Sequence, residues 1–587
     1  MSIEVNISPA EKASIECIQK VYKAIDERKN FLVEAGAGAG KTYTLVKALK
    51  YLINKNADTY LKANKRIACI TYTNVARDEI RSRTDNHPVI FADTIHAFAW
   101  GVIQDFQNAL REKIAGLSEK WQARIDEAGG LNNQQVIYNL GYPKITNEEI
   151  FLHHDDVIKL LTLFLNDLKF KRILTSKFPI ILIDEYQDTN KDLADALVSN
   201  FIESESGPII GFFGDHWQKI YGSTSCGLIE ASSNKLEVIG KQANFRSEKN
   251  IVDALNKMRP ELKQFEYNPD SVGDIIVFHS NNWVGERRTD GHSAGDLPAE
   301  VAHDFLEWTK NTLNKQEWNI SPENTKILML TNNVLASEQN YQNVFTTFSD
   351  TDDFLKKNDP YISFLADMVE VGATSFEKKK YGEMIEAFKM NTPRIRKHTD
   401  KKIWFEDMTS LINLQKNGTV GEVIDLLKIT NKPRLSNKVA EREQRFAELS
   451  TLNQDSISEE DKKFFSKISK IRSIPYTEIK NVVKYIDDKT LYSTKHGVKG
   501  AQFENVIVVL GRGWNHYNWN QLLEWIHIGV PKGKQDTFER NRNLFYVACS
   551  RPQKRLCLLF TQGLSENAIL GVQSLFGDVI FPATPKY

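Results

Sequence analysis

The stretch AGAGAGKT, residues 35–42, has the spacing of a phosphate-binding loop. Its glycines let the backbone turn N–H groups inward onto a polyphosphate. The lysine adds positive charge for the β- and γ-phosphates, and the threonine hydroxyl is a ligand for Mg²⁺. An apolar strand pattern before it and a helical pattern after it favour ATP and Mg²⁺ binding over a plain turn. The residues assigned to the nucleotide here are Ala35, Gly36, Ala37, Gly38, Ala39, Gly40, Lys41 and Thr42.

Two acids follow a second buried strand, in IILIDEYQD at residues 180–188. Asp184 suits a direct or indirect role in holding Mg²⁺ together with Thr42, and Glu185 can polarise an attacking water. Acids also end many strands without any function. The presence of Lys41 in the same α/β segment favours the catalytic interpretation.

A third strand ends in GDHWQKIYG, residues 214–222, where an acid, an amide and two aromatic rings crowd together. Such a turn is either an ordinary surface turn or a site that reads a phosphate on one side and stacks a base on the other. Gln218 and Tyr221 are the residues that would do so.

The composition indicates more about the cellular location of the protein than about the molecules that it binds. The chain has 587 residues, and its 76 basic and 76 acidic side chains give no net charge, so global charge gives no indication of nucleic-acid binding. Its 5 cysteines form no CxxC pair, which favours reduced thiols in the cytoplasm. We find no signal peptide and no apolar run of the ~20 residues that a membrane span needs.

Alternating strand and helix patterns predict an α/β protein with two parallel-sheet domains, each interrupted by a helical insertion. The charged helical runs of the second insertion are expected to be solvated helix faces. The expected domains are residues 1–96 with 173–244, and 245–340 with 485–587; the expected insertions are 97–172 and 341–484.

The order of motifs along the chain resembles the UvrD/Rep/PcrA group of superfamily 1 helicases, and the resemblance runs from residue 35 to about residue 555. The stretches that carry it are AGAGAGKT, TYTNVARDEI, DTIHAF, IDEYQD, GDHWQKIYG, NFRS, TKHGVKGAQFENV and NLFYVACSRPQKRL. The resemblance implies ATP in a cleft between two RecA-like domains and 3′→5′ movement on single-stranded DNA.

The resemblance also assigns roles around the nucleotide. Gln218 would contact the γ-phosphate, and Arg246 and Arg551 would reach across the cleft to stabilise charge on the transferred phosphoryl group. Phe245 would stack on the adenine. Gln502 stands where the family has a glutamate at the sugar.

On the DNA side the resemblance implies contacts from both domains, with hydroxyls and a lysine on phosphates and rings on unpaired bases. For each ring, packing in the core is an equal alternative. The implied DNA contacts are Tyr72, Thr73, Asn74, Thr94, His96, Phe98, Tyr221, Thr494, His496 and Lys499.

The sequence departs from the family pattern around the base. Glu11 stands in place of the glutamine that reads adenine, with Gln19 displaced nearby. Tyr43 replaces the usual basic residue after the loop and can stack on the base instead.

Further departures affect the parts that couple ATP to DNA movement. Ser223 and Thr224 replace the tryptophan and arginine usual after Tyr221, and Leu330 replaces an arginine. Trp217 is a candidate substitute for the missing base-stacking platform.

Two functions therefore remain open, beside a weaker one. The first is an ATP-dependent 3′→5′ DNA helicase acting on single-stranded or tailed duplex DNA. The second is a DNA-stimulated ATPase sensor that controls a partner without processive unwinding. By resemblance to Gabija-type anti-phage defence, that partner would be an OLD-type nuclease. A P-loop ATPase unrelated to helicases leaves NFRS and CSRPQ unexplained.

Overall fold

The computed structural model describes most of the chain. The described residues are 7–139, 143–204, 206–220, 224–232, 234–289, 291–329, 332–348, 350–388, 392–452, 458–487, 489–494, 502–512 and 517–585. Among them, no helix combines the length and the apolar character that crossing a bilayer requires.

The first part of the chain is built on a six-stranded sheet in which every described strand pair is parallel. The strands are near-continuous apolar runs, as expected for a sheet covered on both faces. In sheet order they are β3 (Ile90–Thr94), β2 (Ile67–Thr71), β7 (Ile180–Asp184), β8 (Ile209–Gly214), β1 (Asn30–Ala35) and β9 (Leu236–Lys241). Helices α1 (Pro9–Asp26), α2 (Lys41–Lys62), α3 (Asn74–Arg83) and α9 (Lys191–Leu197) accompany them.

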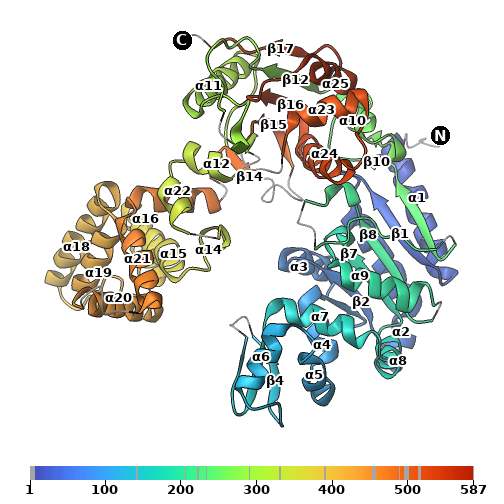
Figure 1. Ribbon diagram of the computed structural model, residues 1–587, viewed down its shortest axis with the longest axis horizontal. Coiled ribbons are helices and arrows are strands. Elements are labelled where there is room, and N and C mark those ends of the chain that lie inside the picture. The colour runs from blue at the N-terminus through green and yellow to red at the C-terminus, as the bar shows by residue number, and fades with distance from the viewer. Residues whose placement is uncertain are drawn as a thin grey trace.

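A second six-stranded sheet, also parallel throughout its described pairs, lies in the second part of the chain. Its order is β14 (Tyr492–Thr494), β13 (Thr325–Met329), β15 (Phe503–Leu510), β16 (Pro552–Phe560), β12 (Asp274–His279) and β17 (Ile580–Pro582). Its helices are α10 (Lys249–Met258), α11 (Ala299–Lys315), α23 (Trp519–Ile528), α24 (Gln535–Cys549) and α25 (Glu566–Phe576). These two sheets confirm the predicted α/β class. Figure 1 shows α24 on the side of the second sheet that faces the first.

The segment between β3 and β7 is not purely helical, contrary to the sequence prediction. It contains a small three-stranded sheet of order β4 (Gln135–Tyr138), β6 (Glu149–Leu152) and β5 (Lys144–Ile145). Strands of 2 to 4 residues are too short to show a period in the sequence. The helices here are α4 (Ile95–Ile103), α5 (Gln107–Ile114), α6 (Glu119–Glu127), α7 (His154–Phe164) and α8 (Leu168–Lys177).

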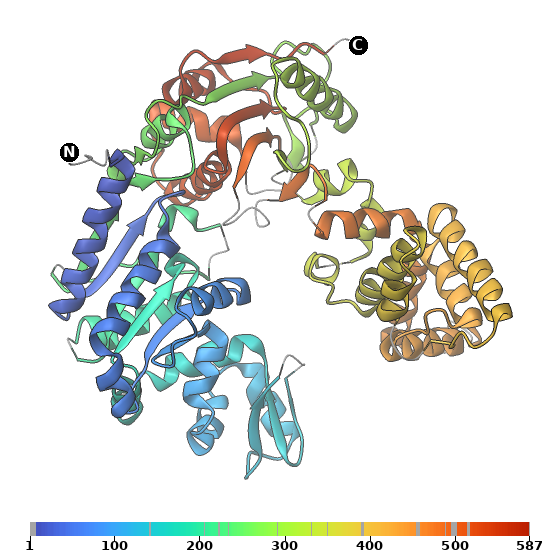
Figure 2. The ribbon, with the colours of Figure 1, turned by 180° about the vertical axis from the view of Figure 1, so that it is seen from behind.

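A helical block stands between β13 and β14 and projects away from both sheets (Figures 1 and 2). Helix α22 leads from it back to β14. The helices are α12 (Asn332–Glu338), α13 (Gln342–Thr347), α14 (Asp352–Leu355), α15 (Pro360–Phe364), α16 (Val371–Glu377), α17 (Tyr381–Phe388), α18 (His398–Asn417), α19 (Val420–Thr430), α20 (Asn437–Ser450), α21 (Glu459–Ser473) and α22 (Tyr476–Ile486).

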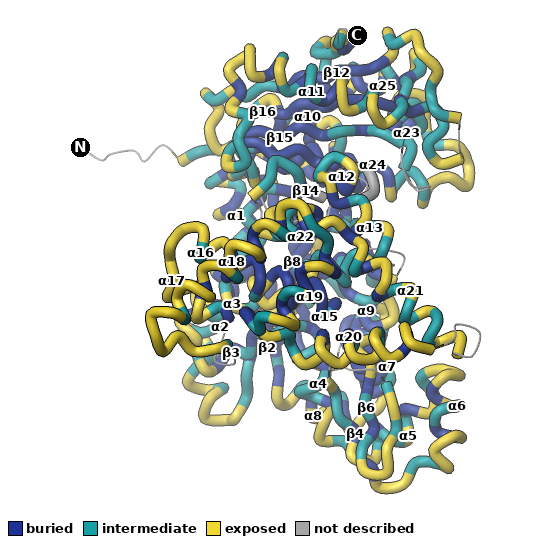
Figure 3. Tube along the Cα trace, turned by 90° about the vertical axis from the view of Figure 1, so that its left-hand side faces the viewer, coloured by how far each residue is buried: buried dark blue, intermediate teal, exposed yellow. Residues whose placement is uncertain are grey.

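The cores follow the sheets and cross between them. Figure 3 shows buried residues concentrated on the strands, and exposed residues on the outer helices and loops. One hydrophobic cluster packs Ala37 and Trp217 of the first part against the apolar residues of β15, β16 and α24 in the second. Tight packing of this kind joins the two sheet-containing parts at the phosphate-binding loop.

Candidate nucleotide and DNA site

The phosphate-binding loop joins the end of β1 to the start of α2, as the sequence predicts. Gly38 and Gly40 have φ angles of 75° and 73°, in the left-handed region that favours glycine. Lys41 begins α2, so its ammonium lies at the positively polarised end of that helix, together with free backbone N–H groups. The conformation is therefore that of an anion-binding loop.

The second part of the chain holds this loop through hydrogen bonds. Gln264 Nε2 donates to the carbonyl of Ala37 at 3.2 Å, as does Asn244 Nδ2 at the boundary between the two parts. Ala37 N in turn donates to the hydroxyl of Tyr546 at 3.2 Å. The phosphate loop thus lies where the two sheet-containing parts meet, and residues of the second part contact it directly.

Lys41 lies close to the two acids at the end of β7. Lys41 Nζ lies 2.6 Å from Glu185 Oε2, and Asp184, at the end of β7, is buried. Burial alone would lower the pKa of Lys41, but the charges of Glu185 and Asp184 raise it above its usual value. The ammonium is therefore fully charged where a polyphosphate would bind.

Glu185 is held in a rare backbone conformation. Its φ of 49° and ψ of 44° are left-handed, which is uncommon for a residue with a side chain. Gln187, which is buried, donates from Nε2 to Glu185 Oε2 at 2.6 Å. Strain held in place by a buried partner is frequent at catalytic sites.

Gln218 and Arg551 are brought together from opposite sheets. Arg551 Nη2 donates to Gln218 Oε1 at 3.2 Å, and Gln218 Nε2 donates to Asp215 Oδ2 at 2.8 Å. Arg246 lies beside them and donates from Nη1 to the carbonyl of Ser550 at 2.9 Å. Three of the predicted catalytic side chains therefore line one cleft.

The electrostatics of the two arginines suit an anionic ligand. Burial lowers the pKa of Arg246 to about 10, and burial together with the charge of Arg246 lowers that of Arg551 to about 9. Among the described residues, Arg246 Nε is buried without a hydrogen-bond partner. A phosphate between the two guanidinium groups would relieve their repulsion.

Two exposed rings flank a buried lysine at the side of the loop. Tyr43 and Phe245 have exposures of 48% and 39%, and Lys241 Nζ lies 5.7 Å and 5.9 Å from their ring centroids. Burial lowers the pKa of Lys241 to about 8, and its ammonium donates to the Gly40 carbonyl at 3.0 Å. Both rings predicted to touch the base therefore lie together, and Lys241 is an addition that the motifs do not reveal.

Glu11, which stands at the position of the adenine-reading glutamine, has a structural role instead. Glu11 accepts a hydrogen bond from Ser8 N at 2.9 Å and closes a capping box at the start of α1. Gln19 is exposed on α1, and Gln502 is exposed directly before β15. Glu11 thus stabilises a helix end.

The donor set fits Mg²⁺. Thr42 places a hydroxyl at the start of α2, and Asp184 places a carboxylate near enough to act on the charge of Lys41. Oxygen ligands of this kind, completed by water and phosphate, are those that Mg²⁺ prefers. A different cluster, Glu34, Asp215 and His216, has ligand atoms within 4.8 Å of one another. There, however, Arg259 already pairs with both carboxylates.

Most of the predicted DNA contacts in the first part lie at two helix starts. Thr73 caps α3 and Thr94 caps α4 through their hydroxyls, and Asn74 is exposed at the first turn of α3. Tyr72 donates to Thr189 Oγ1 at 2.6 Å and is partly buried. His96 stacks on His154 with ring centroids 3.3 Å apart. The structure places these residues near the carboxyl ends of β2 and β3.

Two aromatic residues are buried, contrary to the roles considered for them. Phe98 has 3% exposure and packs against Phe91 and Phe178. It belongs to the core and cannot stack on a base without opening that core. Trp217 has 4% exposure and lies against Tyr546, so it provides no platform for DNA.

Several positions to which the sequence analysis assigned a role lie outside the residues that the structure describes. Tyr221, Ser223, Leu330, His496 and Lys499 lie outside the described residues. Thr494 is the last residue of β14, and only its backbone is described.

Two family models match this chain. Residues 19–224 match the model described as an AAA domain. Residues 329–563 match the model described as the UvrD-like helicase C-terminal domain. The first match includes β1, β2, β3, β7 and β8 of the first sheet, and the second match includes β14, β15 and β16 of the second sheet.

Individual relatives agree with these models. The Gabija protein GajB of Bacillus cereus (strain HuB5-5) is 25% identical over 99% of this chain and 100% of its own length. The ATP-dependent DNA helicases PcrA of Staphylococcus epidermidis and Rep of Buchnera aphidicola are 24% and 26% identical over 42% and 39% of this chain. The aligned regions span only 41% and 42% of those two helicases. The second part of the chain therefore matches the UvrD-like helicase C-terminal domain, and the chain as a whole is similar to a Gabija protein.

Proposed function

We propose that the protein hydrolyses ATP in the cleft between its two sheets and uses the hydrolysis on DNA in the cytoplasm. One observation carries the proposal: Lys41, Glu185 and Gln218 of the first part face Arg246 and Arg551 of the second. Such a set can bind a polyphosphate, orient a water and stabilise charge at the transferred phosphoryl group. Arginines from the opposite sheet make hydrolysis dependent on closure of the cleft.

The residues of this chain divide the chemistry among them. Lys41 and the loop N–H groups bind the β- and γ-phosphates, and Thr42 and Asp184 hold Mg²⁺, which neutralises phosphate charge when bound. Glu185 orients and polarises the attacking water once Lys41 has turned from it to the phosphate. Gln218, fixed by Asp215, contacts the γ-phosphate.

For the use of this hydrolysis, we propose 3′→5′ movement on single-stranded DNA. PcrA and Rep, which match about two fifths of their length here, are named ATP-dependent DNA helicases. Thr73, Asn74 and Thr94 at the starts of α3 and α4 offer hydroxyl and amide groups to phosphates. Tyr221, Thr494, His496 and Lys499 complete the proposed contact set.

A second candidate function has support from two observations. The full-length similarity is to a Gabija protein, and the buried Phe98 and Trp217 remove two of the proposed base-stacking rings. In this alternative the protein is a DNA-stimulated ATPase that regulates a partner nuclease in anti-phage defence, without processive unwinding.

One experiment separates these functions. ATP hydrolysis is measured with and without single-stranded DNA, and strand separation is measured on a 3′-tailed duplex, for the wild type and Lys41→Ala. Helicase function predicts both activities in the wild type and neither in the variant. Stimulated hydrolysis without strand separation rejects unwinding and favours the sensor. Hydrolysis that survives Lys41→Ala rejects the assigned ATP site.

A further inference from the structure

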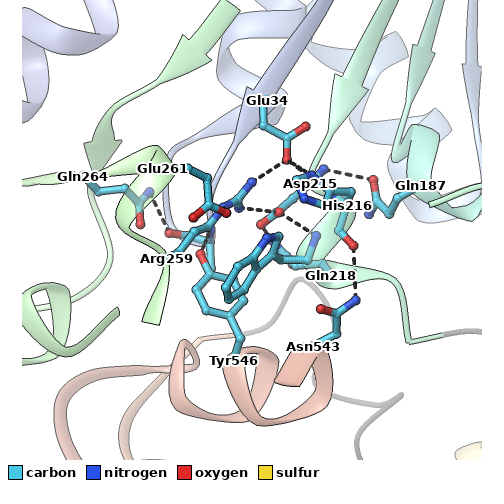
Figure 4. A network of polar contacts seen from close by, with 12 residues as sticks. Glu34, Gln187, Asp215, His216, Gln218, Arg259, Glu261, Gln264, Asn543 and Tyr546 are labelled. Carbon is cyan, nitrogen blue, oxygen red and sulfur yellow. Dashed lines mark hydrogen bonds and ion pairs between the residues drawn. The ribbon is translucent and has the colours of Figure 1, made fainter. Parts of the chain in front are cut away.

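Arg259 stands at the end of α10, in the second part of the chain, but its guanidinium group binds carboxylates of the first part. Nη1 lies 2.6 Å from Asp215 Oδ1, and Nη2 lies 2.6 Å from Glu34 Oε1 (Figure 4). The side chain of Arg259 is 2% exposed. This contact is therefore a buried, bridging ion pair between the two sheet-containing parts.

Both carboxylates belong to the ends of neighbouring strands next to the nucleotide residues. Glu34 in β1 pairs in register with Gly214 in β8, so Glu34 and Asp215 lie side by side. Glu34 immediately precedes the phosphate loop. Asp215 accepts the hydrogen bond from Gln218 Nε2 at 2.8 Å.

Arg259 thereby completes a chain of contacts around Gln218. Arg551 donates to the Oε1 atom of Gln218, while Asp215, paired with Arg259, accepts from its Nε2 atom. The amide is consequently fixed at both ends by arginines of the second part, one directly and one through Asp215. Neither rotation of the amide nor movement of Asp215 is free while both contacts persist.

The charge of Arg259 and the carboxylate of Glu34 stabilise each other. Burial would raise the pKa of Glu34, but the hydrogen bond and charge of His216, and the charge of Arg259, lower it to about 2. Desolvation opposes the charge of Arg259, yet Asp215, Tyr546 and Glu34 raise its pKa above the usual value. Pairing with a cation stabilises the charged form of a buried carboxylate such as Glu34.

The geometry points to Arg259 as a positioning residue: we propose that it transmits closure of the two sheets to Gln218 and to the phosphate loop. The inference rests on the proposed ATP hydrolysis at this cleft. Arg259 itself need not touch the nucleotide, because its guanidinium group is already paired with Glu34 and Asp215. Its loss should impair turnover more than nucleotide binding.

The test compares two matched arginine-to-lysine variants. Arg259→Lys keeps the charge but cannot bridge two carboxylates with a planar fork. The control is Arg472→Lys in the helical block, because Arg472 bridges Glu443 and Asp425 at 2.6 Å each, with 18% exposure, far along the chain from the cleft. Steady-state ATP hydrolysis, binding of a non-hydrolysable ATP analogue and the thermal midpoint are measured for each.

We expect kcat to fall roughly 10- to 100-fold in Arg259→Lys, with KM and analogue binding within about threefold of the wild type. Arg472→Lys should keep the wild-type kcat, and its thermal midpoint should change about as much as that of Arg259→Lys. Wild-type kcat in Arg259→Lys, or a fall that only follows the fraction of folded protein, overturns the proposal. Lack of hydrolysis by the wild type rejects the proposed function instead.

A second variant covers the case in which Arg259→Lys does not fold. Glu34→Gln keeps the shape of its side chain and removes one of the two charges that Arg259 pairs. It should lower kcat with little change in KM. Where both variants fold, the double variant should lose no more than Arg259→Lys alone, because both act through one contact. Additive losses in the double variant overturn the shared mechanism.

Discussion

Glu185→Gln should affect ATP binding and ATP hydrolysis in opposite directions. Lys41 Nζ is paired with Glu185 Oε2 at 2.6 Å, and the two side chains are 12% and 28% exposed. ATP must take Lys41 away from this carboxylate. Replacing the carboxylate by an amide weakens the pair that competes with the phosphate, and also removes a negative charge near it.

The magnitude follows from the kinds of hydrogen bond involved. Because Lys41 stays charged in the variant, both contacts fall in the range of about 1.5–3 kcal/mol for hydrogen bonds to charged groups, the carboxylate near its upper end and the neutral amide near its lower end. The difference of about 1–2 kcal/mol corresponds to roughly 5- to 30-fold tighter binding of ATP. Loss of the group that polarises the water should lower turnover by about 10²- to 10⁴-fold.

The assay is titration with a fluorescent ATP analogue, combined with phosphate release under saturating ATP. Glu27→Gln is the control, because Glu27 pairs with Lys29 at the same 2.6 Å on the surface. That control should leave both quantities unchanged. Weaker nucleotide binding by Glu185→Gln would refute the competition for Lys41, and turnover near the wild-type value would remove Glu185 from the chemistry.

Three further outcomes are expected from the described contacts. Arg551→Ala should still bind the ATP analogue but lose roughly 10³- to 10⁵-fold in turnover, as measured by phosphate release; unchanged turnover would remove Arg551 from the cleft chemistry. Phe98→Ala should lower the free energy of unfolding in urea by about 3–5 kcal/mol, whereas Asn74→Ala should leave it within about 0.5 kcal/mol and weaken single-stranded DNA binding instead. Burial and the nearby His154 lower the pKa of His96 from 6.5 to about 4, so the unfolded chain binds a proton that the folded chain does not and stability falls as pH drops through this range. Between pH 6.5 and about 4, the thermal midpoint of His96→Phe should fall less than that of the wild type. An equal fall would show that His96 does not cause the pH dependence.

The sequence reveals those parts of the site in which residues adjacent in the chain share one function. The loop at residues 35–42 and the acids Asp184 and Glu185 are contiguous, and each directly follows an apolar strand. Phe98 shows where such reasoning fails. The motif DTIHAF, in which Phe98 stands, gives no indication that Phe98 packs against Phe91 and Phe178. Burial of a single ring depends on packing from distant segments.

Other features have no local signal at all. Arg259 stands in KMRPEL, which resembles any helix end, and its partners Glu34 and Asp215 are 225 and 44 residues away. Lys241 likewise ends an ordinary strand. Only the closing of the two sheets against each other brings these side chains to the nucleotide cleft.

The three arginines of the cleft differ in a way that assigns their tasks. Burial lowers the pKa of Arg246 and Arg551, which also repel each other, whereas Asp215 and Glu34 raise that of Arg259. The electrostatics therefore favour an anion beside Arg246 and Arg551, whereas Arg259 is already paired with two carboxylates. A γ-phosphate would supply that anion, so its release after hydrolysis should weaken the hold of the second sheet at Arg246 and Arg551 while the Arg259 contact persists.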